Sequence, residues 1–377
     1  MGGVIATGPH PWTQSLPGII LDTMSGVSSA AMQRALDFCG LFGLRSPILQ
    51  APMAGSSPVA LGVAVANAGG MAGLGALQMS AHEIATWAQG FRAGSNGAFQ
   101  INLWAPDPPP LRDAAREDAA RAAFATLGAE PPPLGDGPFL PDFTAQCDAL
   151  LAARPPVVST IMGLWDAAFV AELKARGILW ICNATTLDEA RQAEAAGADA
   201  IIAQGAEAGG HRGSFTPEVA EAQLIGLFVL VPRLADALRV PVIAAGGIMD
   251  GRGVAAALTL GASAVQLGTA FLRCPETGLA PAWADALPKT APEGTVLTRA
   301  FSGRLARGVA NEATRLFEQV APAPYPLQRL LSAPMRAAAG DISRMQAWAG
   351  QGAAMACAEP AGEVVRRLWA EAKALLP

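Results

Sequence analysis

Short apolar runs alternate with longer segments of helical periodicity from Pro47 onward. The runs are about five residues long, which is the usual length of a strand. Apolar and polar positions hardly alternate within them, as is typical of parallel strands that are buried on both faces. The expected strands are 48–51, 71–75, 99–103, 157–161, 178–182, 200–203, 242–245 and 264–267.

Segments with the period of a helix separate most of these runs. Eight strands with helical crossovers predict an α/β protein with a (β/α)8 TIM barrel. An open doubly wound sheet is the alternative, although no Gly-x-Gly-x-x-Gly loop follows the first strand. The expected crossover helices are 59–68, 81–91, 167–176, 187–196, 223–238 and 253–260.

Two regions fall outside this alternation. Residues 106–156, rich in Pro, Ala and charge, form a longer connection than a crossover needs, so we expect an insertion at the barrel rim. Beyond about Pro275 the strand signals stop. The expected helices are 111–127 and 141–153 in the insertion, and 310–319, 327–340, 342–348 and 362–375 in the tail.

The pattern therefore divides the chain into three parts. Residues 1–43 are an N-terminal extension of unknown role, and 44–275 form the barrel with its insertion at 106–156. Residues 276–377 form a mainly helical lid or cap. The same tail also fits a packing or oligomer surface, so a homodimer stays open.

Composition narrows the class of protein. Hydrophobic residues at 51% and charged residues at 15% indicate a large buried core. A net charge of −5 leaves no basic face for nucleic acid. The five cysteines form no CxxC pair, which favours reduced thiols in a cytoplasmic protein over disulfides or a zinc site. We therefore expect no metal centre.

No targeting or membrane segment is expected. The first thirty residues contain no Lys or Arg, and Gly and Pro break their apolar runs. Two uncharged stretches, 46–82 and 253–272, are interrupted by Gly, Pro, Asn, Ser or Gln. Both fit buried α/β core better than a membrane span.

The loop after the sixth strand carries the clearest chemistry. It leaves the strand through Gln204 and holds four glycines and His211 within nine residues. Glycine permits positive φ and lets backbone amides come close to a flat, anionic ligand. Histidine exchanges a proton near neutral pH. His211 is thus the candidate catalytic residue, although a lone loop histidine is more often structural.

Two further loops are rich in glycine. The seventh strand ends in Gly246-Gly247, with Asp250 at the expected N-cap of the next helix, and the eighth ends in Gly268-Thr269. In barrels these two loops often bind phosphate through backbone N–H groups. The simpler alternative is that the glycines only permit tight turns.

Other polar and aromatic residues have two interpretations each. Glu207 is either a second acid–base group or a residue that orders its loop. Arg304 and Arg307 either reach an anionic ligand or form salt bridges. Large aromatic side chains usually serve packing, yet some of them could line a pocket. These aromatic residues are Trp104, Trp165, Trp348 and the only tyrosine, Tyr325.

From about Leu44 to Trp369 the chain resembles the flavin-dependent nitronate monooxygenases, formerly 2-nitropropane dioxygenases. Several motifs in one order carry this resemblance. It implies an FMN-binding TIM barrel with a helical lid and an oxidation of nitronates by O2 to a carbonyl compound and nitrite. The motifs are Gln50-Ala-Pro-Met53-Ala-Gly55, Gln204-Gly-Ala-Glu-Ala-Gly-Gly-His211-Arg-Gly, Ala244-Ala-Gly-Gly-Ile-Met-Asp-Gly251, Gln266-Leu-Gly-Thr269, Phe301-Ser-Gly-Arg304-Leu-Ala-Arg307-Gly308 and Met345-Gln-Ala-Trp348-Ala-Gly350-Gln351.

The resemblance implies a role for each residue on the flavin side. Pro52 and Met53 would lie against the isoalloxazine ring. Asn102 and Gln204 would hydrogen-bond its polar edge. Gly209 would let the backbone approach the flavin.

The remaining implied roles concern phosphate and chemistry. Gly247 and the turn formed by Gln266, Leu267, Gly268 and Thr269 would hold the ribityl phosphate. His211 would take the α-proton of a neutral nitroalkane. With a preformed nitronate, its imidazole or imidazolium would position the nitro oxygens.

The chain departs from the family's sequence pattern at one position, and two alternative functions stay open. Some bacterial members carry Ser-Phe-His-Phe-Gly where this chain has 159–163, so Ile161 stands at the position of a histidine and the pocket is less polar. Flavin-dependent enoyl-acyl carrier protein reductases, which use NAD(P)H, share the barrel and a Gly-Gly-His element. A non-catalytic barrel that binds a phosphorylated ligand is the second rival.

Overall fold

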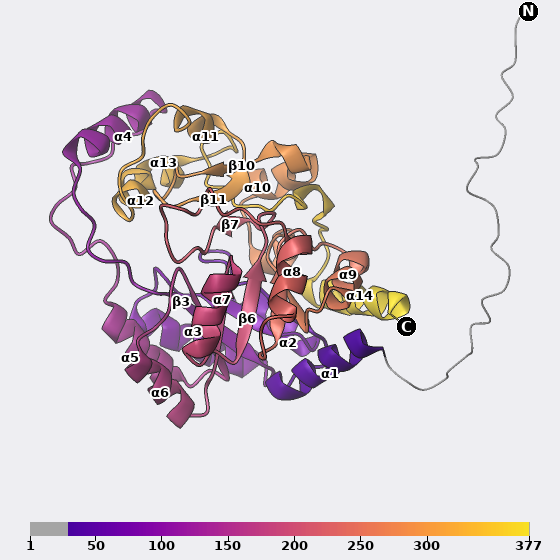
Figure 1. The fold of residues 1–377 in the computed structure, drawn as a ribbon. Coiled ribbons are helices and arrows are strands. Elements are labelled where there is room, and N and C mark those ends of the chain that lie inside the picture. Colours follow the sequence, from indigo (N-terminus) through magenta and orange to yellow (C-terminus); the bar gives the residue numbers. More distant parts are fainter. Residues whose placement is uncertain (1–28, 377) are drawn as a thin grey trace, which may run out of the picture.

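The central sheet closes into a barrel. The computed structural model describes residues 29–376, in which eight parallel strands lie in the order β1-β9-β8-β6-β5-β4-β3-β2. A parallel bridge between Leu49 and Met71 joins the two ends of that order. The predicted (β/α)8 barrel is therefore confirmed, and the open sheet is excluded (Figure 1). The strands are β1 (Ile48–Gln50), β2 (Ala72–Gly75), β3 (Phe99–Trp104), β4 (Val157–Ile161), β5 (Leu179–Ala184), β6 (Ala200–Gln204), β8 (Val242–Ala245) and β9 (Ala264–Leu267).

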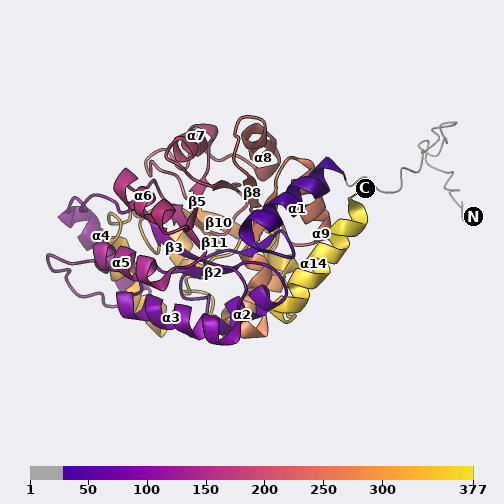
Figure 2. The same cartoon turned by 90° about the horizontal axis from the view of Figure 1, so that it is seen from below.

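A ring of helices covers the outer face of the sheet. Several begin at a side-chain N-cap, as at Ser80, whose hydroxyl and Glu83 form a capping box. The last helix, α14 (Ala361–Leu375), packs against α9 and α2, so it completes the ring after the chain has passed through the lid (Figure 2). The other helices of the ring are α2 (Val59–Asn67), α3 (Ala81–Gly94), α5 (Phe143–Ala153), α6 (Ala167–Ala175), α7 (Leu187–Ala195), α8 (Leu227–Ala235) and α9 (Gly251–Thr259).

Helix α1 (Ala30–Phe42) closes the amino-terminal end of the barrel. Its Phe38 and Phe42 are buried with Leu49, Met71 and Ile243 from the strands. This apolar layer fills the bottom of the barrel, so a ligand can enter only from the carboxyl ends of the strands. Of the predicted extension 1–43, residues 1–28 lie outside the described range.

The lid contains a small sheet that the sequence did not predict. β10 (Thr295–Thr298) pairs antiparallel with β11 (Ala306–Val309), and β11 pairs with β7 (Gly210–His211). The expectation that strands end near Pro275 is therefore wrong. These strands have two to four residues and no apolar periodicity, and their pairing depends on a contact between distant parts of the chain.

The insertion and the tail share one lid core. Phe124 of α4 is buried with Phe301 and Leu327, and α4 lies beside α12 and α13 (Figure 1). Helix α5, the second half of the insertion, packs instead against α3 of the ring. The lid helices are α4 (Ala114–Thr126), α10 (Pro281–Ala286), α11 (Glu312–Leu316), α12 (Leu327–Leu331) and α13 (Ala333–Ala338), with 3-10 turns η1 (Thr269–Phe271), η2 (Pro275–Thr277), η3 (Leu287–Lys289), η4 (Pro292–Gly294) and η5 (Ala353–Met355).

The predicted helix 342–348 is also wrong. Trp348 forms an antiparallel bridge with Gly308, and Val309 N–H donates to the Ala347 carbonyl at 2.9 Å. The segment is thus drawn into extended pairing against β11, a tertiary contact that overrides its local pattern. Within residues 29–376, no helix has the length and apolar character that crossing a membrane requires.

Candidate active site

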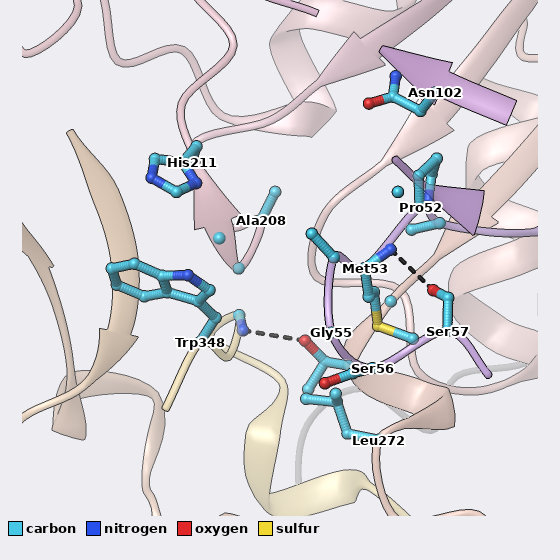
Figure 3. A pocket seen from close by; sticks show the side chains of 18 of the residues that line it. Pro52, Met53, Gly55, Ser56, Ser57, Asn102, Ala208, His211, Leu272 and Trp348 are labelled. Carbon is cyan, nitrogen blue, oxygen red and sulfur yellow. Dashed lines mark hydrogen bonds between the residues drawn. The ribbon is translucent and has the colours of Figure 1, made fainter. Parts of the chain in front are cut away.

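A cavity of about 960 Å³ lies between the carboxyl ends of the barrel strands and the lid. This volume is at the upper end of the range of small-molecule sites, roughly 300–1,000 Å³. Figure 3 shows Pro52, Met53, Asn102, His211 and Trp348 around it. All eleven residues assigned to the site from sequence line the cavity, which brings together loops that lie far apart along the chain.

His211 is held by contacts on three sides. Its backbone belongs to β7, opposite Ala306 of β11. Its Nε2 lies 2.8 Å from the Ser302 hydroxyl. Trp104 and Trp348 contact the imidazole in edge-on geometry, at ring-centroid distances of 4.8 and 5.3 Å. The ring is therefore ordered by the lid as much as by the barrel.

The electrostatic surroundings keep this imidazole neutral. Burial, together with the positive charges of Arg329 and Arg304, lowers the pKa of His211 to about 3. Burial has this effect because a low-dielectric site disfavours the charged form. Of the two forms that the sequence left open, the structure favours imidazole over imidazolium. At neutral pH the imidazole is uncharged, and its lone pair is available to a hydrogen-bond donor or to a proton of the substrate.

A pH-dependent contribution to stability follows from this pKa. An unfolded histidine has a pKa of about 6.5, so the unfolded chain binds more protons at this site between about pH 3 and 6.5. The free energy of unfolding therefore rises with pH across that window and falls as the pH drops. We expect the stability difference between the protein and His211→Asn to change over this window and to be flat above about pH 7.

Denaturant titration at several pH values measures this difference. His82→Asn on α3 is the matched control, because His82 is exposed. A constant difference between parent and His211→Asn from pH 3 to 7 would contradict the lowered pKa of the imidazole.

Gln204 anchors the loop that carries His211. Its Nε2 donates to the His211 carbonyl at 2.9 Å, and its Oε1 accepts from Gly213 N–H at 2.8 Å. Arg212, buried beneath the same loop, donates to the Gln204 carbonyl at 2.6 Å. These bonds explain the glutamine without a ligand, so its predicted contact with a flavin edge stays a prediction.

The lid requires a glycine at position 209 of this loop. A Cβ on Gly209 would lie 2.4 Å from Gly350 N and 2.5 Å from the Ala349 carbonyl carbon. The close approach at Gly209 is thus made by the 349–350 segment of the protein itself. Its approach to a flavin stays a prediction.

Glu207 orders its loop, which was the simpler of the two interpretations of this residue. Both of its carboxylate oxygens accept from Leu227 N–H, at 2.9 and 3.1 Å, at the first turn of α8. The N-cap Gly226 of that helix offers no side chain. A carboxylate at this end of a helix satisfies an unpaired amide and complements the helix dipole.

Backbone amides gather at the ends of β8 and β9. Gly246 and Gly247 both adopt positive φ, +124° and +68°. Within the described residues, the amides of Gly247, Gly268 and Thr269 have no protein acceptor. Backbone N–H groups without a protein acceptor are free to donate to a ligand. Hence this corner of the cavity suits an anion such as a phosphate.

Some polar atoms in this corner already form hydrogen bonds within the protein. Thr269 Oγ1 accepts from Gly350 N–H at 3.0 Å and keeps its own hydrogen to donate. Gln266 Oε1 accepts from Gln100 Nε2 at 3.0 Å, and the Leu267 carbonyl accepts from Ala51 N–H. The predicted phosphate turn is therefore fixed in place by the barrel before any ligand is bound.

The opposite wall is formed by the loop after β1 and the end of β3. Met53 N–H donates to Ser57 Oγ at 3.0 Å, which fixes the Pro52-Met53 turn (Figure 3). Asn102 Nδ2 donates to the Ser159 carbonyl and hydroxyl, both at 3.1 Å. The amide oxygen of Asn102 is left for a ligand. Ile161, at the position of the missing second histidine, lines the cavity and makes that wall apolar.

Sequence reasoning missed three polar residues of the site. Ser302 lies within the motif Phe301-Ser-Gly-Arg304-Leu-Ala-Arg307-Gly308, in which no local pattern distinguishes it. Arg329 and Arg336 line the cavity, and burial lowers the pKa of both guanidinium groups. Within residues 29–376 neither has a carboxylate partner, and the Arg329 side chain has no hydrogen-bond partner. No local pattern marked these arginines, because both lie on short lid helices.

The structure distinguishes between the two interpretations of the arginines and of the large aromatic residues. Arg304 forms an ion pair with Asp107, and Arg307 donates to the Ala206 carbonyl at 3.0 Å. Both therefore stabilise the lid. Trp165 is core packing, stacked on another ring. Trp104 and Trp348 flank His211, and Tyr325 stacks on Trp104 at 5.5 Å, which places it in the lid wall.

Residues 29–376 contain no cluster of metal-binding side chains. These residues hold no group of three or more His, Cys, Asp or Glu side chains that could bind a metal ion. The cavity is lined by the imidazole of His211, the guanidinium groups of Arg329 and Arg336, the capping carboxylate of Glu83 and an array of amides.

Comparison with known proteins assigns the family. The family model described as nitronate monooxygenase matches residues 37–371. The nitronate monooxygenase of Paraburkholderia phytofirmans is 45% identical over 346 residues, which are 88% of this chain and 94% of that protein. The enzyme of the same name from Pseudomonas aeruginosa is 43% identical over 345 residues, with 88% and 97% covered.

Solved structures agree. A nitroalkane oxidase from Streptomyces ansochromogenes superposes with a TM-score of 0.81 at 40% identity, covering 90% of this chain and 98% of that one. FabK from Thermotoga maritima is more distant, with a TM-score of 0.70 and 27% identity over 90% and 96% of the two chains. The match of the family model, the identity to two enzymes and the shared barrel with its lid confirm the resemblance seen in the motifs, and the chain belongs to the nitronate monooxygenase family of oxidoreductases.

Proposed function

We propose that the protein is an FMN-dependent enzyme that oxidises alkyl nitronates with O2 to a carbonyl compound and nitrite. The observation that carries this proposal is the pairing of a neutral His211 with unpaired backbone amides in one cavity. The imidazole suits a reacting nitro compound, and the amides suit a phosphate. Membership of the family supports the same activity.

The residues fit FMN. The amides of Gly247, Gly268 and Thr269 would hold the phosphate, and the Pro52-Met53 turn would support the ring. Asn102 Oδ1 would accept a hydrogen bond from the ring's polar edge, with Gln204 beside it. When bound, FMN supplies the redox chemistry, because it takes electrons from the substrate and delivers them to O2.

The protein's own groups would bind and orient the substrate. Arg329 and Arg336 give the cavity a positive potential that attracts an anionic nitronate. His211 would accept a hydrogen bond, or the α-proton of a neutral nitroalkane. Because the low pKa makes this imidazole a weak base, we propose preformed nitronates as the main substrates and nitroalkanes as slower ones.

We propose a cytoplasmic location for the protein. The two uncharged stretches form buried strands and helices of the barrel, and all five cysteines are free thiols. Both facts support a cytoplasmic protein. The homodimer stays a prediction.

The decisive experiment uses the purified protein. We expect a flavin absorbance spectrum, and nitrite release from propyl nitronate under air. Rapid flavin bleaching by NADH or NADPH without O2, with no nitrite from the nitronate, would instead favour the enoyl-acyl carrier protein reductase. A colourless protein that takes up no FMN on reconstitution would favour the non-catalytic barrel.

A further inference from the structure

The contact between His211 and Ser302 decides where the imidazole carries its hydrogen. The two atoms, Nε2 and Oγ, are 2.8 Å apart, and Ser302 is almost fully buried. A neutral imidazole has one N–H and one lone pair, so the contact runs in one of two directions. Either Nε2–H donates to the serine oxygen, or the serine hydroxyl donates to Nε2.

The surroundings of Ser302 distinguish these directions. Its Oγ accepts from Arg304 N–H at 3.2 Å and lies 3.3 Å from the Arg304 carbonyl. That carbonyl has no other donor within residues 29–376. If the hydroxyl donated to Nε2, the carbonyl of a buried residue would be left unpaired. If Nε2–H donates to Oγ, the hydroxyl can donate to the carbonyl, and Nε2, Oγ and the Arg304 carbonyl all have partners.

The turn that carries Ser302 is fixed independently of His211. Gly303 N–H donates to the Arg299 carbonyl at 2.9 Å, and Ser332 Oγ donates to the Phe301 carbonyl at 2.7 Å. The hydroxyl of Ser302 is therefore presented to the imidazole by the lid. On the other side of the ring, Nδ1 has no partner within the described residues and is not among the enclosed unpaired atoms. Since His211 lines the cavity, Nδ1 is the nitrogen available to a substrate.

We propose that Ser302 is a positioning residue that holds His211 in the tautomer with hydrogen on Nε2, so that the lone pair of Nδ1 faces the cavity. This inference rests on the proposed function for its catalytic consequence. With Nδ1 unprotonated, the imidazole can take an α-proton from a neutral nitroalkane. In the opposite tautomer it could only donate a hydrogen bond.

Nitrogen NMR of the holoenzyme tests the tautomer directly. The sequence holds only three histidines, so ¹⁵N-histidine labelling produces few signals, and His211→Asn identifies those of His211. We expect Nε2 to have the chemical shift of a protonated nitrogen and Nδ1 that of an unprotonated one. We expect Ser302→Ala to shift this balance toward hydrogen on Nδ1. Hydrogen on Nδ1 in the parent protein would overturn the proposal.

Kinetics tests the consequence. We expect Ser302→Ala to lower kcat for nitroethane about tenfold or more, the size usual for partners that orient an active-site histidine. Turnover of ethyl nitronate, which has already lost its α-proton, should stay within about twofold. Ser302→Thr, which keeps the hydroxyl, should restore much of the nitroethane activity. Equal losses on both substrates would overturn the proposal and indicate a merely structural serine.

A matched control comes from the same hairpin. Thr298→Val removes another buried lid hydroxyl, one that accepts from Ala300 N–H and does not contact His211. It should leave both the tautomer and the ratio of the two activities unchanged. If the parent enzyme released no nitrite from either substrate, the proposed function would fail, whereas the NMR result would still decide the role of Ser302.

Discussion

His211→Asn is expected to slow turnover of neutral nitroalkanes by about 10²–10⁴-fold, the usual contribution of general acid–base catalysis. Within residues 29–376, His211 is the histidine that lines the cavity, and a guanidinium group offers no lone pair to a proton. Asn at position 211 would leave no base at this place in the cavity, because its amide nitrogen is a donor only. FMN should stay bound, because the amides assigned to its phosphate lie in the loops that follow β8 and β9, whereas His211 lies on β7.

Parallel assays with nitroethane and ethyl nitronate measure this effect. The loss should be much smaller for the nitronate, since it needs no proton removal. His82→Asn, an exposed substitution on α3, is the control and should match the parent on both substrates. Nitroethane turnover within about twofold of the parent would remove His211 from the role of base.

Gly247→Val is expected to weaken FMN binding about tenfold or more. The position has a φ of +68°, and an added Cβ would lie 3.3 Å from Glu207 Cβ. A β-branched residue in this left-handed conformation costs about 1–2 kcal/mol. The turn would relieve that strain by moving, and about 1.4 kcal/mol corresponds to a tenfold change in affinity. A shifted turn would no longer direct its amides at the phosphate.

The matched control is Gly177→Val, between α6 and β5 at the opposite end of the barrel. Gly177 has a φ of +69° and no neighbour within 4 Å of an added Cβ. It therefore introduces similar backbone strain without approaching the cavity. FMN content per chain and FMN affinity after reconstitution are the measurements. If the two variants retained equal amounts of FMN, the Gly246-Gly247 turn would not be part of the phosphate site.

The local sequence pattern was sufficient to predict the barrel, because each of its strands is buried on both faces. An apolar run such as 242–245 is recognisable whichever strands lie beside it, and its helix begins at Asp250, a side-chain cap that can be read locally. The loops rich in glycine follow strands, and parallel strands of a barrel end on one face. The gathering of Gly247, Gly268 and His211 could therefore be predicted before any contact was known.

The lid could not be predicted in the same way. β7 is two residues long and exists only because β11 lies beside it. The segment 342–348 has a helical pattern, yet it is extended because Trp348 pairs with Gly308. Interactions between distant segments decide such short elements, and local propensity is too weak to oppose them.

The features of the site likewise divide into those that local sequence determines and those that tertiary contacts determine. The sequence by itself determined a barrel with glycine-rich loops at one end, one histidine among them, and membership of a flavoenzyme family through its motifs. Only the tertiary structure decided that this imidazole is neutral, that Ser302 contacts it, and that Arg329 and Arg336 face the same cavity without carboxylate partners. The reason is physical: burial and charge at a site depend on which distant segments fold over it, and here the lid that does so is held by tertiary contacts that leave no period in the sequence.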